Sequence, residues 1–192
     1  MTKGTRRIYY QFSTSRGVGS WFIRWFTWSE FSHVDLVEPD GWLLGARLFA
    51  NHAPSGKGGV QRRPPEYVKF TKTLRVCIEV TQTQYETFWA EAHRQIGKKY
   101  DWLAVFGFLF KKDWQNQDRW FCSEFGLWVA VQAGVRMLNL SRIDRCSPEL
   151  LLCSPEFHRE DEDEYYKYYS EWTIGKRDWP RSPMPASRTF VK

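Results

Sequence analysis

The spacing of apolar residues changes once along the chain, close to residue 82. Before that point the apolar stretches are short and rich in β-branched and aromatic residues, as at 7–12, 60–63 and 73–80, which is typical of strands. The stretches SHVDLV and WLLGARLF flank a Pro-Asp-Gly turn at 39–41, and this arrangement predicts a β-hairpin. The first half of the chain is therefore predicted to be mostly antiparallel sheet.

After residue 82 the apolar residues recur with the period of a helix. Thr83 and Glu86 have the spacing of a capping box, and Gly97 is a suitable stop, so a helix is predicted between them. Its apolar positions are Tyr85, Phe88, Trp89, Ala92 and Ile96.

Two further helices are predicted over 102–110 and over 121–133, the second ended by Gly134. Ser147 and Ser154 are each followed by Pro and Glu, which is typical of a helix start. Together with the strands, these helices predict the α+β class, with an antiparallel sheet packed against a helix that bears a cysteine.

The stretch at 19–28, GSWFIRWFTW, is apolar nearly all round and contains one charged residue, Arg24. Trp and Arg would suit an amphipathic helix lying at a membrane surface. Because the polar face is weak, a buried helix packed against the sheet is the favoured interpretation.

The chain has 192 residues, which suits one compact domain with an appendage. We expect a domain over 1–157 and a C-terminal extension over 158–192 that is first acidic and then basic and rich in proline. No apolar run approaches the roughly 20 residues that cross a bilayer, and the N-terminal stretch lacks a signal-peptide pattern. We expect synthesis in the cytoplasm, while the final location stays open and includes a virion.

The chain carries 28 basic and 22 acidic residues, a formal net charge of +6. This charge permits attraction to an anionic cell-wall polymer, to anionic lipid or to nucleic acid, and selects none of them. A nucleic-acid interface built on Arg62, Arg63 and the basic tail is not favoured, because no recognised binding motif accompanies the charge.

Four cysteines without CxxC pairing predict reduced thiols rather than a disulfide framework. The spacing of Cys146, Cys153 and His158 is only a faint zinc signal, so neither a metal nor a cofactor is expected. Cys122 differs, because it lies at the predicted start of a helix, where unpaired N–H groups favour thiolate and could bind an oxyanion. The competing interpretation is a buried, small hydrophobic side chain.

A nucleophilic cysteine needs a base within hydrogen-bond reach, and the candidates are the four histidines. His33 lies at the start of a predicted strand whose residues Val34, Leu36 and Val37 look core-facing, so its ring would be held rigidly and partly desolvated. His93 lies beside the apolar stripe of a surface helix and is predicted to be solvated. A lone histidine in a strand is more often structural, so neither His33 nor Cys122 is decisive by itself.

Taken in order, the motifs resemble the circularly permuted NlpC-type branch of the papain-like cysteine hydrolases. YiiX-like proteins and the lecithin:retinol acyltransferase group belong to that branch, in which the histidine strand precedes the cysteine helix. The resemblance covers 9–157 and implies a permuted papain-like fold. It is carried by the Ser-His-Val strand, Gly-Lys-Lys-Tyr-Asp-Trp, the Trp-Phe-Cys-Ser-Glu-Phe helix and Ser-Pro-Glu-Leu-Leu.

The resemblance implies that Cys122 is the nucleophile, that His33 is the general base and that Tyr100 helps to line the oxyanion site. It implies acyl transfer to water, in which the cysteine forms a thioester from an amide or ester carbonyl. It points to amide bonds in peptidoglycan stem peptides as the substrate. A phage-encoded protein carried in a virion would reconcile a wall substrate with the missing signal peptide, and its C-terminal extension would dock on an assembly partner.

The chain departs from the family at the residue that usually orients the imidazole from the following strand. The hairpin places Gly45 near that position, and glycine has no side chain to offer. Gln61 on the next strand or Asp35 on the same strand as His33 are the candidates to replace it. Two alternatives therefore stay open: a structural or assembly protein that kept the scaffold without turnover, and a lipid acyltransferase or deacylase that uses 21–28 on a membrane.

Overall fold

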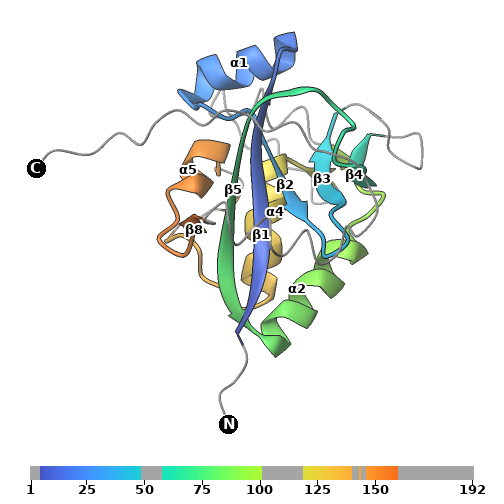
Figure 1. Ribbon diagram of the computed structural model, residues 1–192, viewed down its shortest axis with the longest axis vertical. Helices are drawn as coiled ribbons and strands as arrows, with labels where there is room; N and C mark the ends of the chain where they lie inside the picture. The colour runs from blue at the N-terminus through green and yellow to red at the C-terminus, as the bar shows by residue number, and fades with distance from the viewer. Residues whose placement is uncertain (1–4, 49–57, 101–118, 140–142, 144–145, 160–192) are drawn as a thin grey trace, which may run out of the picture. The chain divides into compact units, whose positions relative to one another are not determined.

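The computed structural model describes residues 5–48, 58–100, 119–139, 143 and 146–159. Within them, six strands form one antiparallel sheet in the order β4-β3-β2-β1-β5-β8 (Figure 1). The strands are β1 (Thr5–Ser15), β2 (His33–Val37), β3 (Leu43–Arg47), β4 (Gly59–Arg63), β5 (Phe70–Thr81) and β8 (His158–Arg159). The predicted α+β class and the antiparallel sheet are confirmed.

The predicted hairpin joins β2 to β3. Its turn is closed by the backbone N–H of Glu38, which donates to the carbonyl of Trp42 at 2.8 Å, and Gly41 supplies a left-handed φ of 83°. Leu36 pairs with Leu44 next to the turn, but no ladder pair follows toward His33, although all residues of both strands are described. The two strands therefore part at the end that carries His33.

Four longer helical segments lie in the described residues: α1 (Val18–Thr27), α2 (Gln82–Arg94), α4 (Cys122–Gln132) and α5 (Pro148–Leu152). Gly97 and Gly134 adopt φ values of 94° and 74° just beyond α2 and α4, which confirms both predicted stops. The Ser147 hydroxyl accepts from the N–H of Leu150 at 3.1 Å and caps α5 as predicted, whereas Ser154 starts a turn and no helix.

The capping box of α2 is formed by Thr81 and Gln84, so its assignment to Thr83 and Glu86 was wrong by two residues. The helix predicted at 102–110 lies outside the described residues. Flanking that stretch, β6 (Lys99–Tyr100) pairs in parallel with β7 (Arg119–Trp120), so Tyr100 is set beside Trp120.

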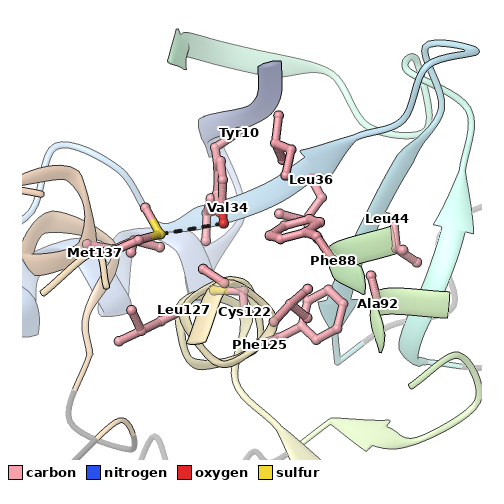
Figure 2. Packing of buried hydrophobic residues seen from close by; sticks show 14 of the residues in the cluster. Tyr10, Val34, Leu36, Leu44, Phe88, Ala92, Cys122, Phe125, Leu127 and Met137 are labelled. Atoms are coloured by element: carbon pink, nitrogen blue, oxygen red, sulfur yellow. Dashed lines mark hydrogen bonds between the residues drawn. The ribbon is translucent and has the colours of Figure 1, made fainter. Parts of the chain in front are cut away.

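The hydrophobic core lies between one face of the sheet and the helices α2 and α4. Figure 2 shows Tyr10, Val34 and Leu36 of the sheet directed toward Phe125 of α4 and Phe88 of α2. Because side chains alternate along a strand, His33 and Asp35 lie on the opposite face from Val34 and Leu36. That second face is covered by a smaller apolar group built from Val37, Leu43 and Tyr67.

Helix α1 is not buried, and this corrects the favoured interpretation of residues 19–28. It lies at one end of the sheet (Figure 1), with Trp21, Trp25 and Trp28 exposed by 57%, 60% and 92%. The rings of Trp21 and Trp25 stack on each other at 6.1 Å instead of entering the core. An all-round apolar pattern shows that a helix needs apolar neighbours and does not show that the rest of the chain supplies them.

His158 and Arg159, which we had placed in the C-terminal extension, pair with Cys77 and Val76 of β5. The rest of the extension lies outside the described residues. None of the helices in the described part of the chain has the length and apolar character required to span a bilayer.

Candidate functional site

Cys122 is the first residue of α4, as predicted. The preceding Phe121 has extended backbone, and its N–H donates to the Glu124 carboxylate at 3.3 Å, which fixes the start of the helix. The Cys122 side chain is 1% exposed and belongs to the main core. Figure 2 shows it on the side of α4 that faces Val34 of β2.

The buried position of Cys122 reverses the expected direction of its pKa. Burial raises the pKa of the thiol to about 12, with a smaller contribution from the negative charge of Asp35. The backbone of Val34, the Arg47 guanidinium and the backbone of Ser123 act in the opposite direction without overcoming burial. Helix N-termini typically contribute about 0.3–1 kcal/mol to a charge, which is less than the desolvation of a buried thiolate. The resting side chain is therefore a thiol, and the predicted thiolate is wrong.

His33 and Asp35 form a buried pair on β2. His33 Nε2 lies 2.8 Å from Asp35 Oδ1, and the two side chains are 9% and 1% exposed. They meet because residues two apart on a strand share a face. The structure thus connects His33 to Asp35, one of the two residues considered as a replacement for the missing orienting group.

The charge states of this pair follow from its surroundings. Burial, and then the positive charge of Arg47, lower the pKa of His33 to about 4, so the imidazole is neutral at pH 7. Burial alone would raise the pKa of Asp35, but His33 and Arg47 hold it well below its usual range. With a neutral ring and an ionised carboxylate, Nε2–H must be the donor. His33 Nδ1 then carries the lone pair that can accept a proton.

Gly45 makes room for the Asp35 carboxylate. A Cβ atom at Gly45 would lie 2.0 Å from Asp35 Oδ1, so no other residue fits opposite this side chain without displacing it. Gln61 lies beside Gly45 in the register of β4 with β3, yet the hydrogen bond to the imidazole is made by Asp35. The imidazole is therefore oriented by a carboxylate on its own strand and not by a side chain of β3 or β4.

Three further side chains hold Asp35, and the sequence did not single them out for this role. The Tyr67 hydroxyl donates to Asp35 Oδ2 at 2.9 Å, and Arg47 Nη2 lies 3.7 Å from the same oxygen. Arg63 is fully buried and donates to the backbone carbonyls of Gly45, Gln61 and Gly59 at 3.0–3.2 Å. We call His33, Asp35, Arg47, Arg63 and Tyr67 the buried polar cluster. Strand alternation could have placed Arg63 on the same sheet face as Gln61, because the two residues are two apart on β4. No local sequence pattern predicts that Tyr67 contacts Asp35.

The remaining predicted residues occupy separate positions. Tyr100 pairs with Trp120, which precedes Cys122 by two positions in the chain. The centroid of the Tyr100 ring lies 6.1 Å from that of Phe121. Between the Cys122 sulfur and the His33 ring, both within the described residues, no hydrogen bond forms in this structure. The Val34 backbone forms a hydrogen bond with the sulfur, and the neighbours of Val34 in the chain are His33 and Asp35.

Two other histidines lie elsewhere. His93 is half-exposed and contacts Glu38 Oε1 at 2.5 Å, close to Arg62, so it belongs to a surface ion-pair group. His158 is exposed on β8, and His52 lies outside the described residues. Among the described histidines, His33 is the one on β2, the strand that packs against the start of the cysteine helix.

Fold and site together define an α+β protein in which a cysteine opens the helix packed on an antiparallel sheet, with a histidine–aspartate pair on the adjoining strand. A solved structure of this architecture is that of the metalloprotein YiiX from Escherichia coli O157:H7. The two are 19% identical, the match covers 80% of this chain and 94% of that chain, and the TM-score is 0.53. This likeness shows a common fold.

No protein-family model matches the chain, and a search of curated protein sequences found no match. YiiX is described as a metalloprotein. The described residues of this chain contain no group of three or more His, Cys, Asp or Glu side chains that could hold a metal ion.

Proposed function

We propose that the chain is a cysteine hydrolase of the permuted NlpC-type papain-like group, which cleaves an acyl bond through a thioester on Cys122. One observation carries the proposal. The backbone next to the cysteine sulfur belongs to Val34, and this residue lies between a neutral His33 and the ionised Asp35 that orients it.

In the proposed reaction substrate binding brings the Cys122 sulfur and the His33 ring, which form no hydrogen bond in this structure, within reach of each other. The sulfur attacks the carbonyl carbon as its proton passes to His33 Nδ1. The new S–C bond forms, and the backbone N–H groups at the start of α4, with Tyr100, stabilise the oxyanion. His33 then gives its proton to the departing amine or alcohol as the C–N or C–O bond breaks. Water attacks the thioester carbonyl as one of its protons passes to His33. The S–C bond then breaks, the carboxylic acid leaves, and His33 returns the proton to the Cys122 sulfur, which restores the thiol.

This mechanism is general-base catalysis rather than attack by a preformed ion pair. Because burial raises the pKa of Cys122 and lowers that of His33, moving the thiol proton to the resting imidazole is strongly unfavourable. Proton transfer must therefore accompany bond formation, or follow a rearrangement on substrate binding. The same pKa values would suit a scaffold without turnover, and the labelling experiment below separates the two.

Family resemblance and the net charge of +6 support amide bonds in peptidoglycan stem peptides as the substrate class. A phage-encoded hydrolase carried in a virion, docked through the extension at 158–192, stays part of this proposal.

Alkylation of Cys122 by iodoacetamide tests the proposed nucleophile. Rates would be followed by mass spectrometry between pH 4 and 10 in the parent, in His33→Ala and in the control His93→Ala, with exposed Cys153 as an internal reference. We expect Cys122 of the parent and of His93→Ala to react with a rate that rises above pH 4 and levels off far below pH 12, because neutral His33 takes the proton. The rise should disappear in His33→Ala. An unreactive Cys122 beside a labelled Cys153, or equal profiles in all three proteins, would favour the scaffold alternative.

The surface of α1 favours a second candidate function, an acyltransferase or deacylase that works on lipid. Three tryptophans project from a helix whose charged residue is Arg24, and tryptophan and arginine suit the membrane boundary. The hydroxyl groups of Ser20 and Ser32 lie 2.7 Å apart, which joins α1 to the residue before His33. A membrane bound to α1 would thus lie at the His33 end of the sheet.

Flotation with vesicles containing anionic lipid tests this candidate. We expect the parent to float with the vesicles, and the double substitution Trp21→Ser with Trp25→Ser to stay in the dense fraction. Val131→Ser on α4 is a matched control, because Val131 is also exposed, by 42%, and lies away from α1. Equal flotation of all three proteins, or of none, would remove the lipid candidate.

A further inference from the structure

We propose that Arg47 forms an anion-binding subsite beside His33, so that the preferred substrate carries a carboxylate or a similar anionic group close to the scissile carbonyl. This inference rests on the proposed hydrolase function and specifies its substrate class.

The buried polar cluster holds more positive than negative charge. Arg47 and Arg63 each bring one positive charge, Asp35 is the one carboxylate of the cluster, and both His33 and Tyr67 are neutral at pH 7. A buried charge is costly without a counter-charge, so an anion entering this region would be stabilised.

The two arginines have different roles. Arg63 is enclosed completely and its two Nη atoms donate to backbone carbonyls of β3 and β4, while its Nε, like that of Arg47, has no hydrogen-bond partner among the described residues. Because it is fully buried, Arg63 has a structural position. Arg47 is 14% exposed and its nearest contact with Asp35 is a long one, at 3.7 Å. Its Nε is buried without a hydrogen-bond partner among the described residues. Arg47 therefore keeps hydrogen-bonding capacity that a ligand could use.

The guanidinium of Arg47 is also held in place. It stacks over the ring of Tyr67 at 4.6 Å and faces Phe70 at 5.7 Å, so it does not move freely as a surface side chain would. A planar, preorganised guanidinium with unused donors suits two-point binding of a carboxylate or phosphate.

Arg47 stands where an anion would influence the reaction. It is the last residue of β3 and shares a sheet face with Asp35 and Gly45, at the end where β2 and β3 part and His33 lies. Its charge acts on both proposed reacting groups, because it lowers the pKa of His33 and opposes the rise in that of Cys122. An anionic group bound to Arg47 would lie at the His33 end of the two strands.

Charge-selective alkylation tests the subsite without a known substrate. Iodoacetate and iodoacetamide transfer similar groups to sulfur, with loss of iodide and of the thiol proton, and differ by one negative charge. The measured quantity is the ratio of their rates at Cys122, divided by the same ratio at exposed Cys153 of the same molecule. We expect this normalised ratio to be about 5 in the parent, the size of effect that one partly screened charge produces over several ångströms.

Three variants accompany the parent. Arg47→Gln should bring the normalised ratio close to 1, while Arg47→Lys should keep most of the preference because it keeps the charge. Lys72→Gln is the control, since Lys72 pairs with Glu30 on the surface and its loss changes the net charge equally. A ratio near 1 in the parent, or an unchanged ratio in Arg47→Gln, would overturn the subsite even if Cys122 reacts readily. Failure of both reagents at Cys122, with Cys153 labelled, would overturn the hydrolase proposal and the subsite with it.

Discussion

At the scale of single residues, Asp35 and Gly45 depend on each other. The carboxylate occupies the volume that any side chain at position 45 would need, with 2.0 Å between Oδ1 and the position of a Cβ atom. We therefore expect Gly45→Ala to displace Asp35 from His33 and from its arginine partners. Overpacking typically costs about 1–3 kcal/mol, and a displaced buried carboxylate places this substitution at the upper end of that range.

The measurement is the free energy of unfolding from urea titration. Gly19→Ala is the matched control, because no atom lies within 4 Å of its Cβ position in α1, and alanine is the better helix former. We expect the control to unfold at an equal or higher urea concentration than the parent. If Gly45→Ala behaves like Gly19→Ala, the Asp35 carboxylate does not depend on the space left by Gly45.

The Tyr67 hydroxyl is expected to contribute to stability through Asp35. Hydrogen bonds to charged groups are typically worth about 1.5–3 kcal/mol, and this one is buried at 2.9 Å. Tyr67→Phe keeps the ring on which Arg47 stacks and removes the donor alone, so we expect a loss of about 2 kcal/mol in urea unfolding. Tyr85→Phe in α2 serves as the comparison, and equal losses in both variants would contradict a special role for Tyr67.

Sequence reasoning found the residues of the site that carry recognisable chemistry and missed those that act through packing. Cys122 and His33 were found through a motif order, and Asp35 through its two-residue spacing from His33. Arg47 and Tyr67 were missed because their contacts join segments that no short-range pattern connects. The burial that raises the pKa of Cys122 likewise depends on three-dimensional packing.

At the scale of the elements, local signals predicted the ends of helices better than their surroundings. Gly97 and Gly134 ended α2 and α4 because a left-handed residue is a local requirement. The capping box was assigned to the wrong residues because two pairs, Thr81 with Gln84 and Thr83 with Glu86, have the spacing that the pattern requires. The exposure of α1 could not be predicted, since burial of an apolar face requires a partner elsewhere in the chain.

The C-terminus of α1 carries a residue that the backbone does not favour. Trp28 caps the helix with a φ of 53° and is 92% exposed, so its indole contributes little packing to compensate for the left-handed conformation. We expect Trp28→Gly to raise the free energy of unfolding by about 1 kcal/mol. Trp28→Ala separates the two causes, because it removes the indole and keeps the Cβ atom.

Chemical unfolding of the parent and both variants gives the comparison. A gain in Trp28→Gly without an equal gain in Trp28→Ala would show that the backbone is strained. In vesicle flotation both variants should bind more weakly than the parent if the exposed indole contacts lipid. A less stable Trp28→Gly would mean that the indole stabilises the fold through contacts that outweigh the strain.

At the scale of the whole molecule, the sheet separates an apolar face from a face with the buried polar cluster. The register of β1 with β2 decides this, since it aligns Phe12 with Val34 toward the helices and Ser13 with His33 on the other side. The sequence of this strand placed Asp35 on the face of His33, but the prediction that Val37 faces the same core as Val34 and Leu36 was wrong, because Val37 packs with Leu43 and Tyr67. The way in which α4 approaches the end of β2, and so brings Cys122 against Val34, depends on the packing of both halves of the chain.

The pair on β2 also predicts how stability depends on pH. His33 has a pKa of about 4 in the folded protein and an ordinary value of 6.5, so between these pH values the unfolded chain binds a proton that the folded protein does not. Stability therefore falls as pH drops from 6.5 to 4, by about 3 kcal/mol at 1.4 kcal/mol per pH unit. Asp35 acts in a lower window, because its depressed pKa contributes stability that is lost only as pH falls below its ordinary value of 3.8.

Urea unfolding of the parent, His33→Gln and the control His93→Gln from pH 4 to pH 7 measures the effect. We expect the control to follow the parent, and His33→Gln to show a flatter curve between pH 4 and 6.5, whatever its stability at pH 7. The difference between the two curves removes the contribution of the other titrating groups, which all three proteins share. Parallel curves for the parent and His33→Gln would mean that His33 protonates in the folded protein as readily as in the unfolded chain. In that case burial beside Asp35 and Arg47 does not lower the pKa of His33, and the charge states assigned to the buried polar cluster are wrong.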